Sequence, residues 1–135
     1  MSESEEYEAI RIELENRIYD YFNKFEIPDE PTIYDFLILS LTNKDLIATF
    51  NWDPLLTQAY QRCSNITRNL PELVFLHGTV SLGICYKDKS AGLIDECCSK
   101  CRNPFEKIPL LYPVREKIMN RIYLSKTNGI LLDSI

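Results

Sequence analysis

The sequence has no excess of basic residues, no long apolar run and few glycines. Its 15 lysines and arginines are outnumbered by 20 aspartates and glutamates, which gives a formal net charge of −5. Such a chain has no broad positive surface to neutralise nucleic-acid phosphates or anionic lipids, which argues against both as partners. No stretch of about 20 apolar residues occurs, and the acidic N-terminus lacks the basic and apolar segments of a secretory signal. A cytoplasmic protein that binds neither nucleic acid nor membrane is therefore predicted.

The rest of the composition is that of one ordinary globular domain. Of the 135 residues, 45% are hydrophobic and 26% are charged, and this mixture predicts a folded core. The five cysteines are expected to be thiols or metal ligands rather than disulfides, in keeping with their odd number. Cys63 is interpreted as an ordinary buried or half-buried thiol, whereas the others gather between Cys85 and Cys101.

An apolar stripe indicates a long helix at the start of the chain. Ser2 and Glu5 form a capping-box pattern, which places the beginning of this helix. Large apolar side chains then recur at steps of three and four residues, which is the spacing of one helical face. We expect this face to pack on the protein's own core, and the alternative is a docking helix for a partner. The residues of the stripe are Tyr7, Ile10, Leu14, Ile18, Tyr21 and Phe25.

Two shorter helices are indicated further along the chain. The first follows two prolines and has Thr32 and Asp35 as a second capping pair. The second is the segment PLLTQAYQR, which has helical spacing. Asp53 is its predicted N-cap, and Pro54 would occupy the favoured first helical position.

Three short apolar segments predict strands, at residues 46–50, 73–76 and 108–113. The third is bounded by prolines, so it is expected to be short. Helices interleaved with strands predict an α/β fold, which we interpret as a partial Rossmann-like parallel sheet with flanking helices.

Polar side chains follow two of these predicted strands. Asn51 and Asp53 come after the first strand, and the single histidine, His77, comes after the second with Gly78 behind it. Ligands of parallel sheets bind at the carboxyl ends of the strands, so we expect these groups in one crevice. An imidazole can take a proton near neutral pH, and an amide can orient a water molecule or a sugar hydroxyl. The competing interpretation is that these are turn and helix-cap residues.

Four segments occur in a familiar order: DLIATFNWDPLLTQAY, LPELVFLHGTVSLGIC, CSKC and PLLYPVREK. Together they resemble the sirtuin-like domains, of the silent information regulator type, found in bacterial NAD-cleaving proteins. The resemblance covers about residues 32–117. It implies a nucleotide substrate, NAD, cleaved between nicotinamide and ribose, frequently in antiphage defence. It further implies that His77 is the general base, Asn51 an orienting residue, and Thr49, Asn51 and Asp53 the groups beside the nicotinamide ribose.

The chain departs from that family in its phosphate-binding part. The family begins with a glycine-rich loop whose amides bind the NAD pyrophosphate, and such a loop needs closely spaced glycines. None of the four glycines precedes Asn51, and no Gly-x-Gly occurs. We therefore expect a partial domain that is inactive or incomplete on its own. Its open sheet edges predict a homo-oligomer or a partner chain that completes the sheet.

The cysteine cluster predicts a small zinc-ribbon-like insertion. Cys98 and Cys101 are separated by two residues, a spacing that lets two thiolates reach one tetrahedral zinc. Cys85 is the third predicted ligand, and either Cys97 or Asp88 is left to complete the set. A zinc bound here would be structural, and the alternative is a ribbon with free thiols.

These observations give one domain and three hypotheses for its function. The chain is an NAD-cleaving sirtuin-like domain fragment, a non-catalytic interaction or scaffold module, or a small zinc-binding protein. Its predicted parts are a helix with its linker, a core with the strand-end motifs, a cysteine insertion, and a C-terminal strand and helix. They span residues 1–30, 32–84, 85–104 and 105–135 in that order.

Overall fold

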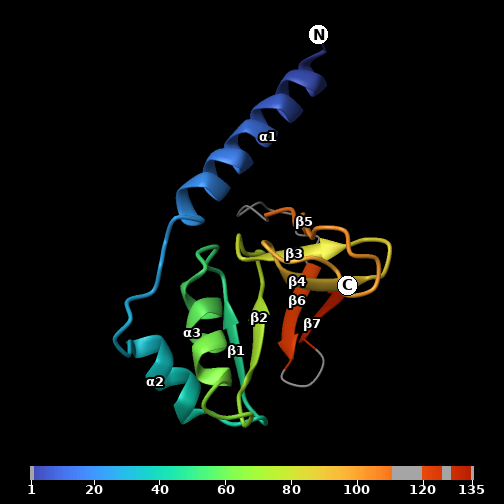
Figure 1. The fold of residues 1–135 in the computed structure, drawn as a ribbon. Coiled ribbons are helices and arrows are strands. Elements are labelled where there is room, and N and C mark those ends of the chain that lie inside the picture. Colours follow the sequence, from blue (N-terminus) through green and yellow to red (C-terminus); the bar gives the residue numbers. More distant parts are fainter. Residues whose placement is uncertain (1, 111–119, 126–128, 135) are drawn as a thin grey trace.

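A computed structural model describes residues 2–110, 120–125 and 129–134, and Figure 1 shows its helices and strands. Helices and strands are mixed along the chain, which confirms the α/β class. In chain order the elements are α1 (Glu3–Phe22), α2 (Ile33–Ser40), β1 (Leu46–Thr49), α3 (Leu55–Ser64), β2 (Glu72–Phe75), β3 (Leu82–Cys85), β4 (Ser90–Leu93), β5 (Glu106–Lys107), β6 (Asn120–Ser125) and β7 (Gly129–Ser134).

The first two helices begin at the predicted caps. The Glu5 carboxylate accepts from the Ser2 N–H at 2.8 Å, and the Ser2 hydroxyl accepts from the Glu5 N–H at 3.3 Å. At the start of α2 the Asp35 carboxylate accepts from the Thr32 N–H at 2.7 Å. Each pair satisfies N–H groups that have no partner within the helix, which fixes where the helix starts.

The third helix begins one residue later than predicted. Pro54 occupies the N-cap because its carbonyl accepts the first helical hydrogen bond, from the Gln58 N–H at 3.0 Å. Asp53 lies just outside the helix, and its carboxylate accepts from the Leu55 N–H at 3.0 Å. The aspartate therefore still satisfies an N–H of the first turn, as a helix start requires.

The strands form one sheet in the order β1-β2-β6-β7-β4-β3-β5. In the described part of the chain only β1 and β2 run parallel, with Thr49 beside Phe75, and the other pairs are antiparallel. The prediction of a parallel sheet is therefore correct for these two strands alone. The pairs β3–β4 and β6–β7 are joined by connections of three or four residues, at 86–89 and 126–128, which permit only antiparallel pairing.

The third predicted strand is wrong over its described residues, Ile108 to Leu110, which have no strand partner. Their backbone is bound by side chains of α1 instead. The Tyr19 hydroxyl donates to the Ile108 carbonyl at 2.6 Å, and the Leu110 N–H donates to Glu15 at 2.8 Å. Pro109, between them, has no N–H to offer a sheet. Residues 111–113 lie outside the described part.

The predicted C-terminal helix is also wrong over the described residues 120–125 and 129–134, because β6 and β7 pair antiparallel there. The sequence carries a signal for this arrangement. An Asn-Gly pair at 128–129 lies between two segments rich in isoleucine and leucine, a pattern that favours a hairpin.

The main hydrophobic core lies between the helices α2 and α3 and the strands β1, β2 and β3. Leu73, Phe75 and Leu82 have no exposed surface, and burial of each such side chain contributes about 1.5–3 kcal/mol. The buried members are Ile38, Leu56, Ala59, Tyr60, Cys63, Leu70, Leu73, Phe75, Leu82, Ile84 and Ile108.

Most of the apolar stripe of α1 does not join a core, so the expectation of self-packing is wrong for that part. Figure 1 shows the helix projecting from the sheet. Its buried residue is Tyr19, in a second cluster with Val80 and Leu110. Tyr19 and Glu15, whose hydrogen bonds hold the helix, lie on a different face from the stripe, so most of the stripe remains in solvent. Within the described ranges, no helix combines the length and apolar character that crossing a bilayer requires.

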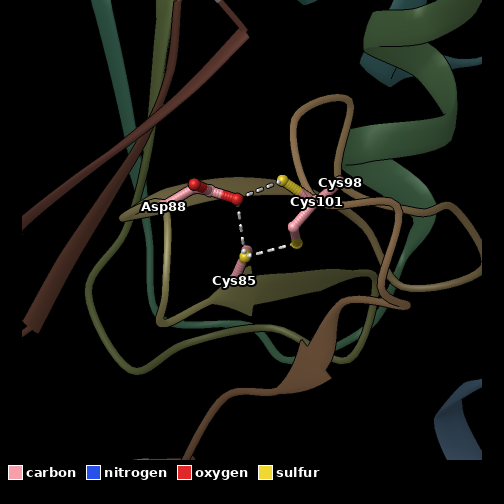
Figure 2. A group of neighbouring side chains, drawn as sticks. All are labelled: Cys85, Asp88, Cys98 and Cys101. Atoms are coloured by element: carbon pink, nitrogen blue, oxygen red, sulfur yellow. Dashed lines mark hydrogen bonds between the residues drawn. The ribbon is translucent and has the colours of Figure 1, made fainter.

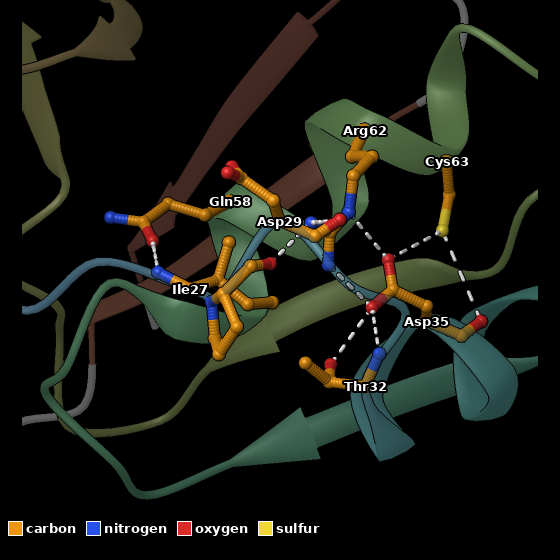
Figure 3. A network of polar contacts seen from close by, with 8 residues as sticks. Ile27, Asp29, Thr32, Asp35, Gln58, Arg62 and Cys63 are labelled. Carbon is orange, nitrogen blue, oxygen red and sulfur yellow. Dashed lines mark hydrogen bonds and ion pairs between the residues drawn. The ribbon is translucent and has the colours of Figure 1, made fainter.

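An ion pair joins α2, α3 and the linker after α1 (Figure 3). Arg62 donates to both carboxylate oxygens of Asp35, at 2.9 and 2.6 Å, and to the Pro28 carbonyl at 2.6 Å. The hydrogen bonds from Arg62 hold the pKa of the buried Asp35 well below its ordinary value. Burial raises the pKa of the neighbouring Cys63, which was predicted to be buried or half-buried and is fully buried. This thiol is therefore part of the packing.

Candidate metal centre and the carboxyl edge of the parallel strands

The strands β3, β4 and β5 form an antiparallel ribbon built around two glycines. Gly83 pairs directly with Gly92, and the Phe105 side chain covers both. A Cβ atom at Gly92 would lie 2.2 Å from the Phe105 ring, and one at Gly83 would lie 2.8 Å from the Glu106 carbonyl oxygen. Glycine is needed at both positions because the ring and the backbone of β5 occupy the space of a side chain.

Two tight turns of equal spacing bring four ligand-bearing side chains together. One turn joins β3 to β4, and the other lies between β4 and β5. The residue after each turn, Lys89 or Arg102, has a positive φ, of 49° or 62°. Such values are uncommon outside glycine, and here they curl both turns in the same sense. The first and last residues of the turns are Cys85 with Asp88 and Cys98 with Cys101.

The four side chains point toward a common centre, as Figure 2 shows. The Cys85 sulfur lies 3.6 Å from an Asp88 carboxylate oxygen and 3.5 Å from the Cys101 sulfur. The same Asp88 oxygen lies 3.3 Å from the Cys98 sulfur. All four ligand atoms fall within 4.8 Å of one another, so this cluster can hold a metal ion.

Hydrogen bonds prepare these groups for a positive charge. The Ser90 hydroxyl, 3.4 Å from the Cys98 sulfur, and backbone N–H groups of the turn lower the pKa of Cys98. Hydrogen bonds from Cys101 and Cys98 lower the pKa of Asp88. The Asn103 backbone N–H lowers the pKa of the Cys101 thiol. Burial and hydrogen bonds with Asp88, Cys85 and Cys98 outweigh it and raise that pKa to about 11. A bound cation would remove the remaining thiol protons, because coordinated thiols are deprotonated.

The structure thus brings together the three predicted cysteine ligands. The fourth group in the cluster is Asp88 and not Cys97. Cys97 is exposed and pairs with Pro104 in an isolated bridge. Successive side chains of extended backbone point to opposite faces, so Cys97 and Cys98 are directed apart. A sequence signal for Asp88 existed, since it stands at the same spacing from Cys85 as Cys101 does from Cys98. No sequence signal indicated the contribution of Ser90.

The loops that follow β1 and β2 lie side by side at one edge of the sheet. The Trp52 indole N–H donates to the His77 carbonyl at 3.1 Å, and the Trp52 carbonyl accepts from the Val80 N–H at 2.9 Å. The rings of Phe50 and His77 lie 4.8 Å apart between centroids. Asn51 is exposed and His77 is half-buried. The parallel register of β1 and β2 therefore places both predicted catalytic residues at this edge.

The other predicted residues at this edge have local roles. The Thr49 hydroxyl accepts from the Asn51 N–H at 3.1 Å, and the Asp53 carboxylate serves the start of α3. A hollow of about 370 Å³ opens beside the start of α3, lined in part by Thr57 and Ser81, and neither Asn51 nor His77 lines it. These contacts are what the turn and helix-cap interpretation predicts.

Comparison of the chain with protein-family models, curated proteins and solved structures finds no match. The fold and the cysteine cluster by themselves define an α/β protein with a candidate metal centre. The resemblance to sirtuin-like domains rests on the sequence motifs alone.

Proposed function

We propose that this chain is a small zinc-binding domain whose structural zinc is held by Cys85, Asp88, Cys98 and Cys101. The convergence of two equally spaced turns on one centre carries the proposal. Around a tetrahedral zinc with Zn–S of about 2.3 Å and Zn–O of about 2.0 Å, ligand atoms lie on the order of 3.5–3.8 Å apart. Separations of 3.3, 3.5 and 3.6 Å in the cluster are close to these values.

The chemistry of the ligands favours zinc in a structural role. Thiolates select softer transition metals, whereas magnesium and calcium prefer oxygen ligands. Four protein ligands fill a tetrahedral shell, which leaves no open position for a catalytic water. The ion would join the β3–β4 turn to the loop before β5, and that cross-link is the function we assign to it.

Metal content tests this proposal with a matched pair of neighbouring cysteines. We expect about one zinc per purified chain, by analogy with structural sites, and its loss in Cys98→Ser. Cys97→Ser changes the adjacent exposed cysteine, so that variant should keep its zinc. A wild-type protein that folds without metal, or equal metal loss in both variants, would contradict the proposal.

We propose as a second function that the edge beside Asn51 and His77 binds the nicotinamide ribose of NAD, as in the sirtuin-like domains that the motifs resemble. The adjacency of the two loops supports it, since Trp52 of one loop donates to the His77 carbonyl in the other. The strands β1 and β2 with the intervening α3 form a parallel β-α-β unit, the building unit of Rossmann-like folds.

In this reaction, cleavage breaks the bond between nicotinamide and ribose. Nicotinamide leaves with the bonding electron pair, positive charge develops at the ribose carbon, and a water oxygen forms the new bond there. His77 takes the proton that this water loses, and the Asn51 amide orients the water. Because the described chain has no glycine-rich phosphate loop, a partner chain would supply the pyrophosphate contacts.

NAD binding and nicotinamide release test the second function. We expect weak NAD binding in titration calorimetry, reduced at least tenfold by His77→Ala or Asn51→Ala. Asn65→Ala removes another exposed asparagine away from this edge and should bind as the wild type does. Equal binding by all four proteins would exclude the edge as the site. Nicotinamide release that survives His77→Ala would exclude the assignment of the base.

A further inference from the structure

The projecting helix α1 carries a large apolar surface that the described chain leaves in solvent. Four side chains of the stripe are exposed by about half or more: Tyr7 by 71%, Ile10 by 60%, Leu14 by 49% and Tyr21 by 62%. Ile18, the remaining stripe residue within α1, is partly buried against the second cluster. Soluble proteins rarely expose such a continuous apolar row without a partner for it.

The row is symmetric in both spacing and residue type. Tyr7 and Tyr21 stand seven residues on either side of Leu14, and Ile10 and Ile18 stand four residues on either side. A second copy of the helix, turned end for end about an axis at Leu14, would therefore place tyrosine opposite tyrosine and isoleucine opposite isoleucine. A two-fold interface requires this kind of self-complementary surface.

We propose that α1 is a dimerisation helix, which pairs antiparallel with α1 of a second copy through the Tyr-Ile-Leu-Ile-Tyr row centred on Leu14. The steps of three and four residues suit side-by-side helix packing in such a pair. The helix can pair without leaving its own domain. Tyr19, which anchors it, points about 140° around the helix from Leu14.

The distribution of charge favours the antiparallel orientation. The first turn of α1 contains three acidic residues, Glu3, Glu5 and Glu6, whereas its last turn contains one acidic residue, Asp20, and no basic residue. Lys24 follows the helix, and pairing about Leu14 would bring it near Glu3 and Glu6 of the second copy. A parallel pair would instead set the two acidic first turns against each other, which costs free energy.

The dimer should be of moderate affinity. One helix pair buries less surface than the roughly 1,600 Å² of a stable complex, so we expect dissociation in the micromolar range. The described ion pairs of α1 join residues of the same helix, such as Arg17 with Glu13 at 2.7 Å. Because these ion pairs lie within one helix, they do not have to break when the dimer forms.

Sedimentation equilibrium of the full chain from about 1 to 500 µM tests the dimer across the expected range. The wild type should dimerise, and Leu14→Glu should weaken association at least tenfold, with an unchanged circular dichroism spectrum. Ile33→Glu is the matched control, because Ile33 on α2 is 79% exposed and lies outside the row. A wild type that stays monomeric throughout, or equal weakening by both variants, would overturn the proposal.

Disulfide trapping in a Cys97→Ser background tests the orientation. A mixture of Tyr7→Cys and Tyr21→Cys chains should form a mixed disulfide, because these positions meet in the antiparallel pair. Neither variant should link to itself, since the like positions would lie about 21 Å apart along the helix axis. Self-linked dimers of each variant without the mixed species would show a parallel pair and overturn the proposed arrangement.

Discussion

The helical part of the molecule and the cysteine ribbon are held together in different ways. Around α2, α3, β1 and β2, side chains such as Ile38 and Phe75 are fully buried, and the Arg62–Asp35 pair ties in the linker. In the ribbon, β3 is buried and contributes Leu82 and Ile84 to the main core, but every residue of β4 is only half-buried and both residues of β5 are exposed. Burial alone can stabilise the first region, whereas we expect β4 and β5 to need the proposed zinc at the ligand cluster. The difference indicates that a metal would matter for one end of the sheet and not for the other.

Removing the metal should have the largest effect and should act on the ribbon alone. We expect chelation, or Cys101→Ser, to raise hydrogen exchange of residues 85–107 at least a hundredfold. Binding of a structural zinc contributes on the order of 10 kcal/mol in small peptides, more than the weak burial of β4 and β5 can replace. Exchange mass spectrometry should find α3 still protected. A uniform rise in hydrogen exchange over the whole chain would contradict the proposed difference between the ribbon and the helical part.

Breaking the ion pair should destabilise the helical part instead. Arg62→Ala leaves the Asp35 carboxylate buried without its partner, and we expect a loss of about 3 kcal/mol in urea unfolding. Arg17→Ala is the control, because its pair with Glu13 is exposed and should contribute at most about 0.5 kcal/mol. Zinc content should stay at the wild-type value in both variants. Similar losses in the two would remove the distinction between a buried and an exposed pair.

Acid should weaken the same contact by a smaller amount, because a protonated Asp35 still donates and accepts hydrogen bonds. Arg62 lowers the pKa of Asp35 in the folded state, so the carboxylate stabilises the fold above its unfolded pKa of about 3.9. That contribution should decline as the pH falls below about 4. Melting temperatures of the metal-free protein should drop more steeply with acid for the wild type than for Asp35→Asn. Equal slopes of melting temperature against pH in the two proteins would refute Asp35 as the origin of the acid sensitivity.

The smallest effect should come from the glycines of the ribbon. Gly92→Ala sets a methyl group against the Phe105 ring, and we expect a loss of about 2 kcal/mol. Most of that loss should disappear in a Phe105→Leu background, where the obstructing ring is gone. The loss from Gly83→Ala should persist there, because its Cβ would also meet the Glu106 backbone oxygen. Unfolding of the wild type, the three single variants and the two double variants measures this coupling.

The positions and caps of α1 and α2 followed directly from the sequence, whereas strand partners did not. The pairs Ser2–Glu5 and Thr32–Asp35 involve neighbours in the chain, so their hydrogen bonds are local and readable. Leu110 gave no local sign that its N–H would bind Glu15 of α1, and the apolar pattern around it suggested a strand. Strand pairing depends on distant segments, and prediction from one segment cannot decide it.

The candidate metal cluster was likewise predictable from the sequence only in part. The spacing of Cys98 and Cys101 marked a ligand pair, because two thiolates on one turn reach a common ion. The fourth group was settled only when the β3–β4 turn carried Asp88 to within 3.3 Å of the Cys98 sulfur and left Cys97 exposed. The sequence by itself determined α1 and α2 with their starts, α3 to within one residue, and the Cys98–Cys101 pair of the candidate cluster, because these depend on near neighbours in the chain. Tertiary structure decided the sheet order, the exposed face of α1 and the fourth group of the candidate metal cluster, because those depend on contacts between segments far apart in the chain.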